Sequence, residues 1–332
     1  MSLSSNIAII GSGSWATALA KLFLNNVKHI HWFIRNEHDI SHFNTYKTNP
    51  KYLSSVEFDT TQITFHTSIS ACVKNSDYLI LAIPSAFLHD SFEELNEGNL
   101  KNKIIFSAIK GIVPQHNLIV GEYLHKIYNV PLQHIGVITG PCHAEEVALE
   151  KLSYLTIASI NNEHATQISN WLNCRYLKST VSDDIYGTEY SAVLKNVIAV
   201  AGGICHSLGY GDNFLAVLVS NAIQEIKRFV DAVHPIDRDI NASAYLGDLL
   251  VTAYSQVSRN RMFGTMLGKG YSVKQAQLEM NMIAEGFYAV KCVYEINKAY
   301  HVHMPITSAV YAIVYQNQNV RKEITNLSNI LT

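Results

Sequence analysis

The sequence lacks the marks of a secreted, disulfide-stapled or membrane-spanning protein. Its five cysteines are dispersed with no C-x-x-C pair, which argues against a disulfide framework and a structural zinc site. The first residues, MSLSSNIAIIGSGSW, have neither a basic segment nor a long apolar core, so they predict no secretory signal. The most apolar stretch, Ala192–Cys205, contains Lys195 and is too short to cross a bilayer. These absences predict a cytoplasmic protein without stable membrane insertion.

An excess of one charge sign and the common hydrolase motifs are missing as well. The chain has 25 Lys and Arg against 27 Asp and Glu, a balance that gives no electrostatic basis for binding nucleic acid. It contains neither H-E-x-x-H nor G-x-S-x-G. His143–Glu145 opens like a zinc deaminase signature, but the required P-C-x-x-C is absent, and His301 and His303 have no third ligand placed with them. We therefore predict no nucleic-acid partner and no metal.

The first half of the 332 residues alternates apolar, β-rich runs with helical patterns such as Ser14–Asn26. Such alternation is typical of a parallel sheet with crossover helices, and continuous apolar runs indicate a sheet covered on both faces. The predicted strands are Asn6–Ile10, Ile30–Arg35, Ile63–His66, Tyr78–Ile83, Lys103–Ala108, Ile135–Thr139 and Tyr154–Ser159.

In the second half, apolar residues recur at helical spacing over long stretches, without the turn residues that would bound short strands. The fold class predicted is therefore an α/β doubly wound sheet followed by an all-helical C-terminal domain, with domains at 1–185 and 186–332. The predicted helices are Tyr186–Ala201, Asn213–Ala232, Ala242–Ser258, Glu285–Ala299 and Thr307–Tyr315.

The first strand runs directly into a G-x-G-x-x-A turn that opens a helix. Gly11 permits the tight turn, Gly13 lets a pyrophosphate approach the backbone, and Ala16 lets the helix pack on the strand. The helix N-terminus then presents free N–H groups to the phosphates. This context indicates a dinucleotide site, the alternative being an ordinary strand–helix turn.

The second strand ends at Arg35, where an NAD-selective site usually has Asp or Glu. An arginine there suits the 2′-phosphate of NADP. We predict that NADP(H) is preferred and that NAD(H) is also used, the alternative being that Arg35 is a solvated surface residue.

Other strand ends carry chemically interesting residues, because ligands gather at the carboxyl ends of strands in open α/β sheets. Lys110 stands directly before Gly111, so it is a candidate contact for an anion, the alternative being a solvated loop lysine. Another predicted strand ends in Thr139-Gly140-Pro141-Cys142, a loop that opens a helix.

Lys195 lies inside an apolar helix, beside Asn196. A partly buried lysine has a lowered pKa and can act as a general acid or base near neutral pH, whereas the alternative is a structural lysine that reaches to solvent. Farther on, Asp248 is a candidate ion-pair partner for Lys195. Arg259 with Asn260 forms a donor-rich pair suited to a small phosphate, the alternative being a solvated helix end.

A series of short motifs follows in a fixed order along nearly the whole chain. They are IIGSGSWATALA, LAIPS, IKG, GPCHAEE, LKNVIAVAGG, GDLLVT, SRNRMFG, AEG and MPI. In this order and spacing they resemble bacterial-type NAD(P)-dependent glycerol-3-phosphate dehydrogenase. The resemblance implies a Rossmann domain, a helical domain, and reversible hydride transfer between dihydroxyacetone phosphate and sn-glycerol 3-phosphate that supplies phospholipid synthesis. It also implies a homodimer.

The resemblance carries roles onto individual residues. It implies that Lys195 is the catalytic lysine and that Asp248 orients it. The cofactor positions are Gly11, Gly13, Ser14, Trp15, Arg35, Lys110, Ala144, Arg259, Ile283 and Glu285. The substrate positions are Lys110, Gly140, Lys195, Asn196, Asp248, Thr252, Ser258, Arg259 and Asn260.

The chain departs from the family pattern in two places: Cys142 stands where Ser or Thr is common, and Trp15 where Tyr or Phe is common. Two other functions stay open at this point. One is a related two-domain dehydrogenase acting on a 3-hydroxyacid or 6-phosphogluconate. The other is a non-catalytic NADP-binding regulator, against which the combination of Lys195, Asp248 and Arg259 argues.

Overall fold

A computed structural model describes residues 6–255, 258–280 and 284–332. Contacts divide the chain into two compact units. The first unit comprises Met1–Ile109 and Val120–Ile185, and the second comprises Lys110–Ile119 and Tyr186–Thr332. The segment Lys110–Ile119 therefore belongs to the second unit, although the sequence placed it in the predicted first domain, residues 1–185.

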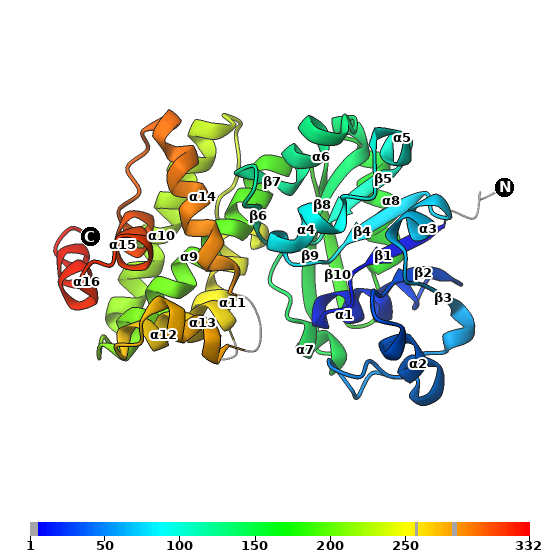
Figure 1. Ribbon diagram of the computed structural model, residues 1–332. Helices are drawn as coiled ribbons and strands as arrows, with labels where there is room; N and C mark the ends of the chain where they lie inside the picture. The colour runs from blue at the N-terminus through cyan, green and yellow to red at the C-terminus, as the bar shows by residue number, and fades with distance from the viewer. Residues whose placement is uncertain (1–5, 256–257, 281–283) are drawn as a thin grey trace. The chain divides into compact units, whose positions relative to one another are not determined.

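The first unit is built on an eight-stranded sheet whose strand order is β10-β9-β8-β5-β4-β1-β2-β3 (Figure 1). The strands are β1 (Ile7–Ile10), β2 (Ile30–Phe33), β3 (Ile63–His66), β4 (Tyr78–Leu81), β5 (Ile104–Ser107), β8 (Ile135–Thr139), β9 (Ser153–Ser159) and β10 (Leu177–Ser182). Neighbouring strands pair in parallel except β8 with β9, which pair antiparallel. The predicted parallel sheet is thus confirmed apart from that one pair.

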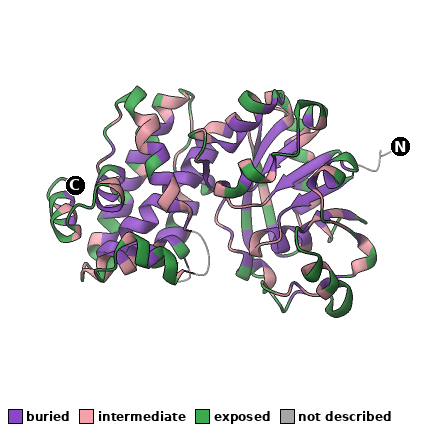
Figure 2. Ribbon diagram, in the orientation of Figure 1, coloured by how far each residue is buried: buried purple, intermediate pink, exposed green. Residues whose placement is uncertain are grey.

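The central strands are buried because helices cover both faces of the sheet. Every residue of β1, β4 and β8 is buried, as the purple ribbon in Figure 2 shows. The helices of this unit are α1 (Ser14–Phe23), α2 (Glu37–Tyr46), α3 (Ile69–Lys74), α4 (Leu88–Ser91), α5 (Glu97–Leu100), α6 (Val120–Tyr128), α7 (Ala144–Ala148) and α8 (Asn162–Leu172). The continuous apolar runs of the sequence therefore correspond to strands with two covered faces.

The second unit is helical, apart from a small hairpin of β6 (Ile112–Val113) and β7 (Leu118–Ile119). Its helices are α9 (Ile185–Ser207), α10 (Asp212–Val233), α11 (Asp248–Tyr254), α12 (Arg259–Gly268), α13 (Val273–Glu279), α14 (Glu285–Tyr300), α15 (Pro305–Tyr315) and α16 (Val320–Ser328). Among the described residues, no helix is long and apolar enough to cross a membrane. The predicted helix Ala242–Ser258 is wrong in detail, because a π-helical turn over Ser243–Gly247 precedes α11 and the backbone is extended at Ser255.

Glycines allow α9, α12 and α14 to approach one another closely. A methyl group added at Gly203 of α9 would clash with the carbonyl oxygen of Arg261, and one at Gly264 of α12 with that of Val200. A methyl group at Gly286 of α14 would lie 2.7 Å from the carbonyl oxygen of Asn196. These contacts hold the turn of α9 that carries Lys195 and Asn196 against α14.

Candidate functional site

Two lysines of the second unit meet one buried carboxylate. Lys195 on α9 forms an ion pair with Asp248, the first residue of α11, and the two residues are 5% and 1% exposed. Lys110, which precedes β6, places its Nζ 3.2 Å from Oδ2 and 3.3 Å from Oδ1 of the same carboxylate. When Lys195 is protonated, the cluster has one negative and two positive charges and is therefore net positive.

The cluster shifts the pKa values of its members in opposite senses. Burial, together with the charge of Lys110, lowers the pKa of Lys195 to about 7, although Asp248 opposes the change. Burial works against ionisation of Asp248, but the charges of Lys110 and Lys195 outweigh it and hold the pKa of that carboxyl below its usual value. Lys195 can therefore give up or take a proton near neutral pH beside a carboxylate that stays ionised.

Hydrogen bonds fix the backbone around these charges. The side-chain Nδ2 of Asn196 donates to the carbonyl oxygen of Lys110 at 2.7 Å. Thr252 Oγ1 donates to the carbonyl oxygen of Asp248 at 2.8 Å. The first bond ties α9 to the segment that carries Lys110, and the second lies within α11.

The N-terminus of α12 holds the other predicted substrate residues. Ser258 caps the helix by accepting from the backbone N–H of Arg261, and Arg259 is its exposed first residue. Asn260 is buried, and its side-chain oxygen accepts from the backbone N–H of Gly286 at the start of α14. The exposed guanidinium thus stands at a helix N-terminus, where positive charge and free N–H groups favour an anion.

In the first unit, the turn between β1 and α1 has the backbone that a dinucleotide requires. Gly11 has φ +130°, and a methyl group there would lie 2.5 Å from the Ala82 carbonyl oxygen. At Gly13 no atom of the described residues lies within 4 Å of where a methyl group would stand. The first turn of α1 contains no acidic residue to repel an anion. The turn therefore leaves open space for a pyrophosphate at a helix N-terminus.

Trp15, in the first turn of α1, adds a second feature that fits a bound dinucleotide. Its ring nitrogen Nε1 is buried and has no hydrogen-bond partner among the described residues. A buried N–H without an acceptor is costly, and a bound ligand would supply one. Together with the open face at Gly13 and the neighbouring Ser14, this donor fits a dinucleotide.

The remaining predicted residues of the first unit also follow the carboxyl ends of strands. Arg35 is exposed after β2, Gly140 has φ +119° after β8, and Ala144 is the first residue of α7. Since β1, β2 and β8 run in the same direction through β4 and β5, these ends share one edge of the sheet. That edge is where open α/β sheets bind their ligands.

Three predicted cofactor residues, Lys110, Arg259 and Glu285, lie in the second unit, and Ile283 is outside the described residues. The structure forms the ion pair between Asp248 and Lys195 that the sequence suggested. The pairing of Lys110 with Asp248 was not foreseen. These residues are 138 positions apart, and no local pattern links them.

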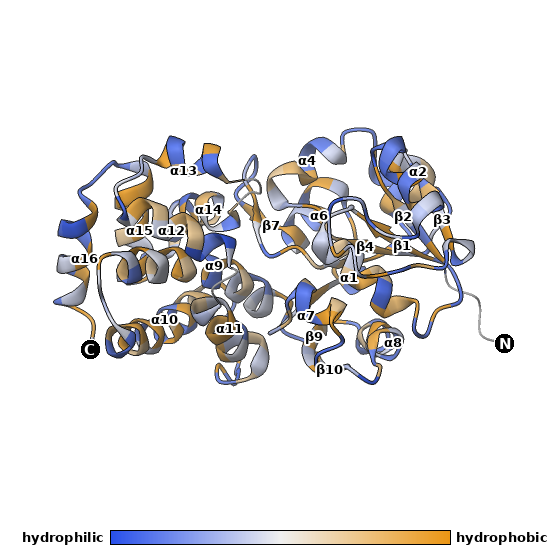
Figure 3. Ribbon diagram, turned by 90° about the horizontal axis from the view of Figure 1, so that it is seen from below, coloured by the Kyte–Doolittle hydropathy of each residue, from blue (hydrophilic) through white to orange (hydrophobic). Residues whose placement is uncertain are grey.

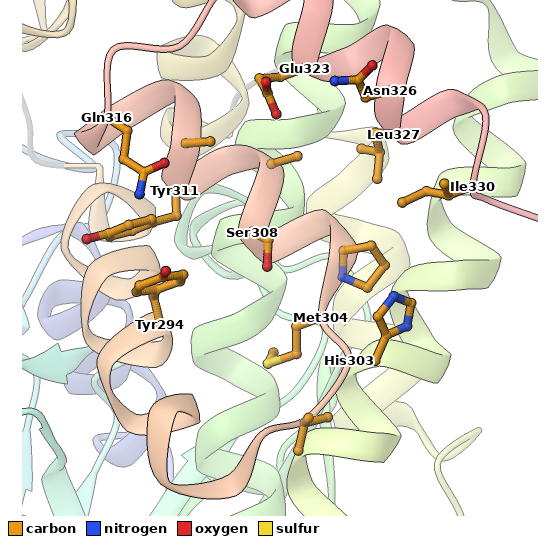
Figure 4. Close-up of a pocket in the computed structure, with 14 residues that line it drawn as sticks. Tyr294, His303, Met304, Ser308, Tyr311, Gln316, Glu323, Asn326, Leu327 and Ile330 are labelled. Atoms are coloured by element: carbon orange, nitrogen blue, oxygen red, sulfur yellow. The ribbon is translucent and has the colours of Figure 1, made fainter.

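A separate pocket lies among α14, α15 and α16 and has a volume of about 510 Å³ (Figure 4). The stacked rings of Tyr294 and Tyr311, with centroids 3.7 Å apart, form part of its wall. The other lining residues are Val302, His303, Met304, Pro305, Ser308, Ala309, Ala312, Gln316, Glu323, Asn326, Leu327 and Ile330. None of the predicted site residues lines this pocket.

Comparison with known proteins assigns both units to one family. The family model described as NAD-dependent glycerol-3-phosphate dehydrogenase N-terminus matches residues 6–165, and the corresponding C-terminus model matches residues 184–325. Glycerol-3-phosphate dehydrogenase [NAD(P)+] of Oceanobacillus iheyensis is 33% identical over 97% of this chain and 93% of its own length. The protein of that name from Macrococcus caseolyticus is 31% identical over 97% of both chains.

A solved structure supports the same assignment. The crystal structure of glycerol-3-phosphate dehydrogenase from Coxiella burnetii superposes with a TM-score of 0.89 at 26% identity, covering 97% of this chain and 98% of the other. The open glycine turn, the buried lysine cluster and these matches agree. The chain belongs to the NAD-dependent glycerol-3-phosphate dehydrogenase family.

Proposed function

We propose that this chain transfers hydride reversibly between NAD(P)H and dihydroxyacetone phosphate, forming sn-glycerol 3-phosphate. The observation that carries the proposal is the buried cluster of Lys195, Asp248 and Lys110 in a member of this family. Its net positive charge suits an anionic substrate. Its lysine of pKa about 7 suits proton transfer to and from an oxygen.

A nicotinamide held at the glycine turn would supply or accept the hydride. In reduction, Lys195 donates its proton to the carbonyl oxygen as negative charge develops there, and in oxidation it takes the hydroxyl proton back. Asp248 holds the Lys195 ammonium in place, and Lys110 adds positive charge beside it. Arg259 and Asn260 bind the substrate phosphate from the N-terminus of α12.

The direct test is NADPH oxidation with dihydroxyacetone phosphate, with dihydroxyacetone and 2- and 3-hydroxyacid or ketoacid pairs as controls. We expect turnover that depends on the phosphate. Turnover of a phosphate-free acid with none of dihydroxyacetone phosphate would assign the chain to another dehydrogenase activity. Cofactor binding without turnover of any substrate would favour a regulator.

The Arg259→Ala variant is expected to raise KM for dihydroxyacetone phosphate much more than it lowers kcat. A charge-assisted contact of about 1.5–3 kcal/mol corresponds to roughly a ten- to hundredfold change in binding. Steady-state kinetics check this, with Arg261→Ala as the matched control because the Arg261 guanidinium donates to the Tyr254 carbonyl oxygen. An equal loss of activity toward phosphate-free dihydroxyacetone would contradict the phosphate role.

The Arg35→Asp variant is expected to erase or reverse a preference for NADPH over NADH. The exposed guanidinium follows β2, where it can pair with the 2′-phosphate, and an aspartate would repel that group. The measurement is kcat/KM for both cofactors in both proteins, with Lys51→Asp as an exposed control of the same charge change. An unchanged ratio of the two kcat/KM values would show that Arg35 does not read the phosphate.

We also propose a cytoplasmic homodimer that supplies glycerol 3-phosphate for phospholipid synthesis. The support is family membership and a dispersed set of cysteines, which are free thiols. Sedimentation of the purified chain would test the dimer. Loss of phospholipid labelling from glycerol 3-phosphate precursors after depletion of the protein would test the metabolic role.

A further inference from the structure

Three histidines gather on one edge of the sheet in the first unit, at the strands β2 and β3. His29-Ile30-His31 enters β2, and alternation along a strand directs both imidazoles to the same face. His66 ends β3, which is the edge strand next to β2 (Figure 1). The H-x-H pattern of one strand therefore lies beside a third histidine on its neighbour.

The pairing of the strands explains why these side chains meet. β2 and β3 pair in parallel, with His31 opposite Thr64 and Phe33 opposite His66. Residues opposite each other share a face, so His31 and His66 are diagonal neighbours on that face. The other face is occupied by Trp32 and its aromatic neighbours, which leaves the histidines on the side away from that cluster.

The ring nitrogens already face one another. His31 Nδ1 lies 2.9 Å from His66 Nε2, a distance at which the two imidazoles share one proton. The His29 and His31 ring centroids are 5.4 Å apart, and His29 Nε2 is 3.1 Å from Thr64 Oγ1. His31 and His66 are half-buried and His29 is exposed, so an ion from solvent can reach all three.

We propose that His31 and His66, joined by His29 after its ring turns away from Thr64, form a binding site for one divalent ion of the late first transition row, such as Zn²⁺, Cu²⁺ or Ni²⁺. Imidazole nitrogens suit these ions, and three histidines are an established donor set for zinc. With Zn–N bonds of about 2.0–2.1 Å in a tetrahedron, two ligand nitrogens stand about 3.3 Å apart. To admit the ion in place of the shared proton, the two rings separate and turn so that both nitrogen lone pairs point at it.

The surroundings keep the imidazoles in the form that binds metal. Burial lowers the pKa of His31, helped by the neighbouring His66 and His29, and burial also lowers the pKa of His66. Neutral imidazole is the form that binds metal. The bound ion would join the edge strand β3 to β2 by side chains as well as by the backbone.

A second group in the same unit is the natural competitor. Ligand atoms of His89, Asp90 and Glu93 lie within 4.8 Å of one another, on and beside the four-residue helix α4. Both carboxylates are exposed, and His89 Nδ1 is engaged by the hydroxyl of Tyr123 at 3.1 Å. This group therefore serves as the control rather than as the proposed site.

The experiment is titration of the full, untagged and chelator-treated chain with Zn²⁺ and Ni²⁺, followed by calorimetry and by thermal unfolding. We expect one ion per chain with a rise in Tm. Loss of a group that only hydrogen-bonds to a metal ligand typically weakens metal binding by roughly 10–100-fold. His31→Gln and His66→Gln each remove a ligand, so each should weaken binding by at least that factor. His29→Gln should weaken it less, and His89→Gln should leave it unchanged.

Metal-free activity with dihydroxyacetone phosphate should be the same in all four variants, because none alters the lysine cluster or the glycine turn, and this shows that they fold. Wild-type binding that survives in both His31→Gln and His66→Gln would overturn the proposal, as would loss of binding in His89→Gln or the absence of binding to the wild type.

Discussion

The Lys195→Ala variant is expected to lose about 10²–10⁴-fold in kcat, the usual contribution of a positioned acid, while its affinity for NADPH stays close to that of the wild type. Lys195 is buried against Asp248 in the second unit, whereas the glycine turn that fits the dinucleotide is in the first. Removing the ammonium therefore removes the proton donor and leaves that turn intact. Steady-state kinetics and NADPH fluorescence titration measure the two quantities.

Lys298→Ala is the matched control for this variant. Lys298 is exposed and pairs with Glu295 on the surface of α14, so its loss should leave kcat unchanged. A Lys195→Ala enzyme that keeps more than half of the wild-type kcat would contradict the assignment of the acid.

The pH profile gives an independent reading of the same residue. Reduction needs the protonated form of Lys195, so its rate should fall as pH rises through about 7. Oxidation needs the neutral form, so its rate should fall as pH drops through the same range. The residual activity of Lys195→Ala should show neither of these two pH dependences. A pH dependence that persists in this variant would belong to another group.

The Asp248→Asn variant is expected to destabilise the fold by about 3–5 kcal/mol, because it leaves two ammonium groups together without their buried counter-ion. It should also reduce the rate of reduction at neutral pH, since loss of the carboxylate lowers the pKa of Lys195 further. Urea unfolding measures the loss of stability, provided that the unfolding free energy depends on urea concentration with nearly the same slope in both proteins. Glu295→Gln, which removes an exposed carboxylate paired with one lysine, is the control and should have little effect.

The sign of the pH dependence follows from the lowered pKa of Asp248. Stabilisation from a carboxylate of depressed pKa is complete above its ordinary value of 3.8 and is lost as pH falls through the folded-state value. The difference in unfolding free energy between wild type and Asp248→Asn should therefore shrink as pH falls below 3.8, whereas around pH 7 it also varies because the pKa of Lys195 differs between the two proteins. A difference that grows as pH falls below 3.8 would contradict the ionised state of Asp248.

The strands that could be predicted have a continuous apolar or β-branched pattern, whether they are buried throughout, as β8 is, or lie at the edge of the sheet, as β3 does. Ile63–His66 and Ile135–Thr139 were predicted to the residue. β10 was missed because it is an edge strand with several exposed residues and has no continuous apolar run. The helices α12, α13 and α16 were also missed, and in Figure 3 α13 and α16 show hydrophobic and hydrophilic segments in turn. Surface helices of this kind give a weaker signal than the buried α9.

The candidate site divides in the same way. Lys195 was predictable because a charge inside an apolar helix is rare, and Asp248 because a buried cation needs a partner. The antiparallel pairing of β8 with β9 and the contact of Lys110 with Asp248 depend on how distant segments meet. The secondary-structure propensity of a short segment carries no information about contacts between residues far apart in the sequence.

The membership of the hairpin β6–β7 in the second unit bears on the order of events during synthesis. Ile112 and Ile119 lie in the same hydrophobic core as residues of α14, which begins at Glu285. At about 5–20 residues per second, the roughly 170 intervening residues take about 10–35 seconds to emerge from the ribosome. For that time the two isoleucines of the hairpin lack the α14 part of their core, although the α9 and α10 parts are made earlier. The nascent chain is thus open to chaperone capture at this hairpin, and a ribosome pause before α14 would lengthen the exposure.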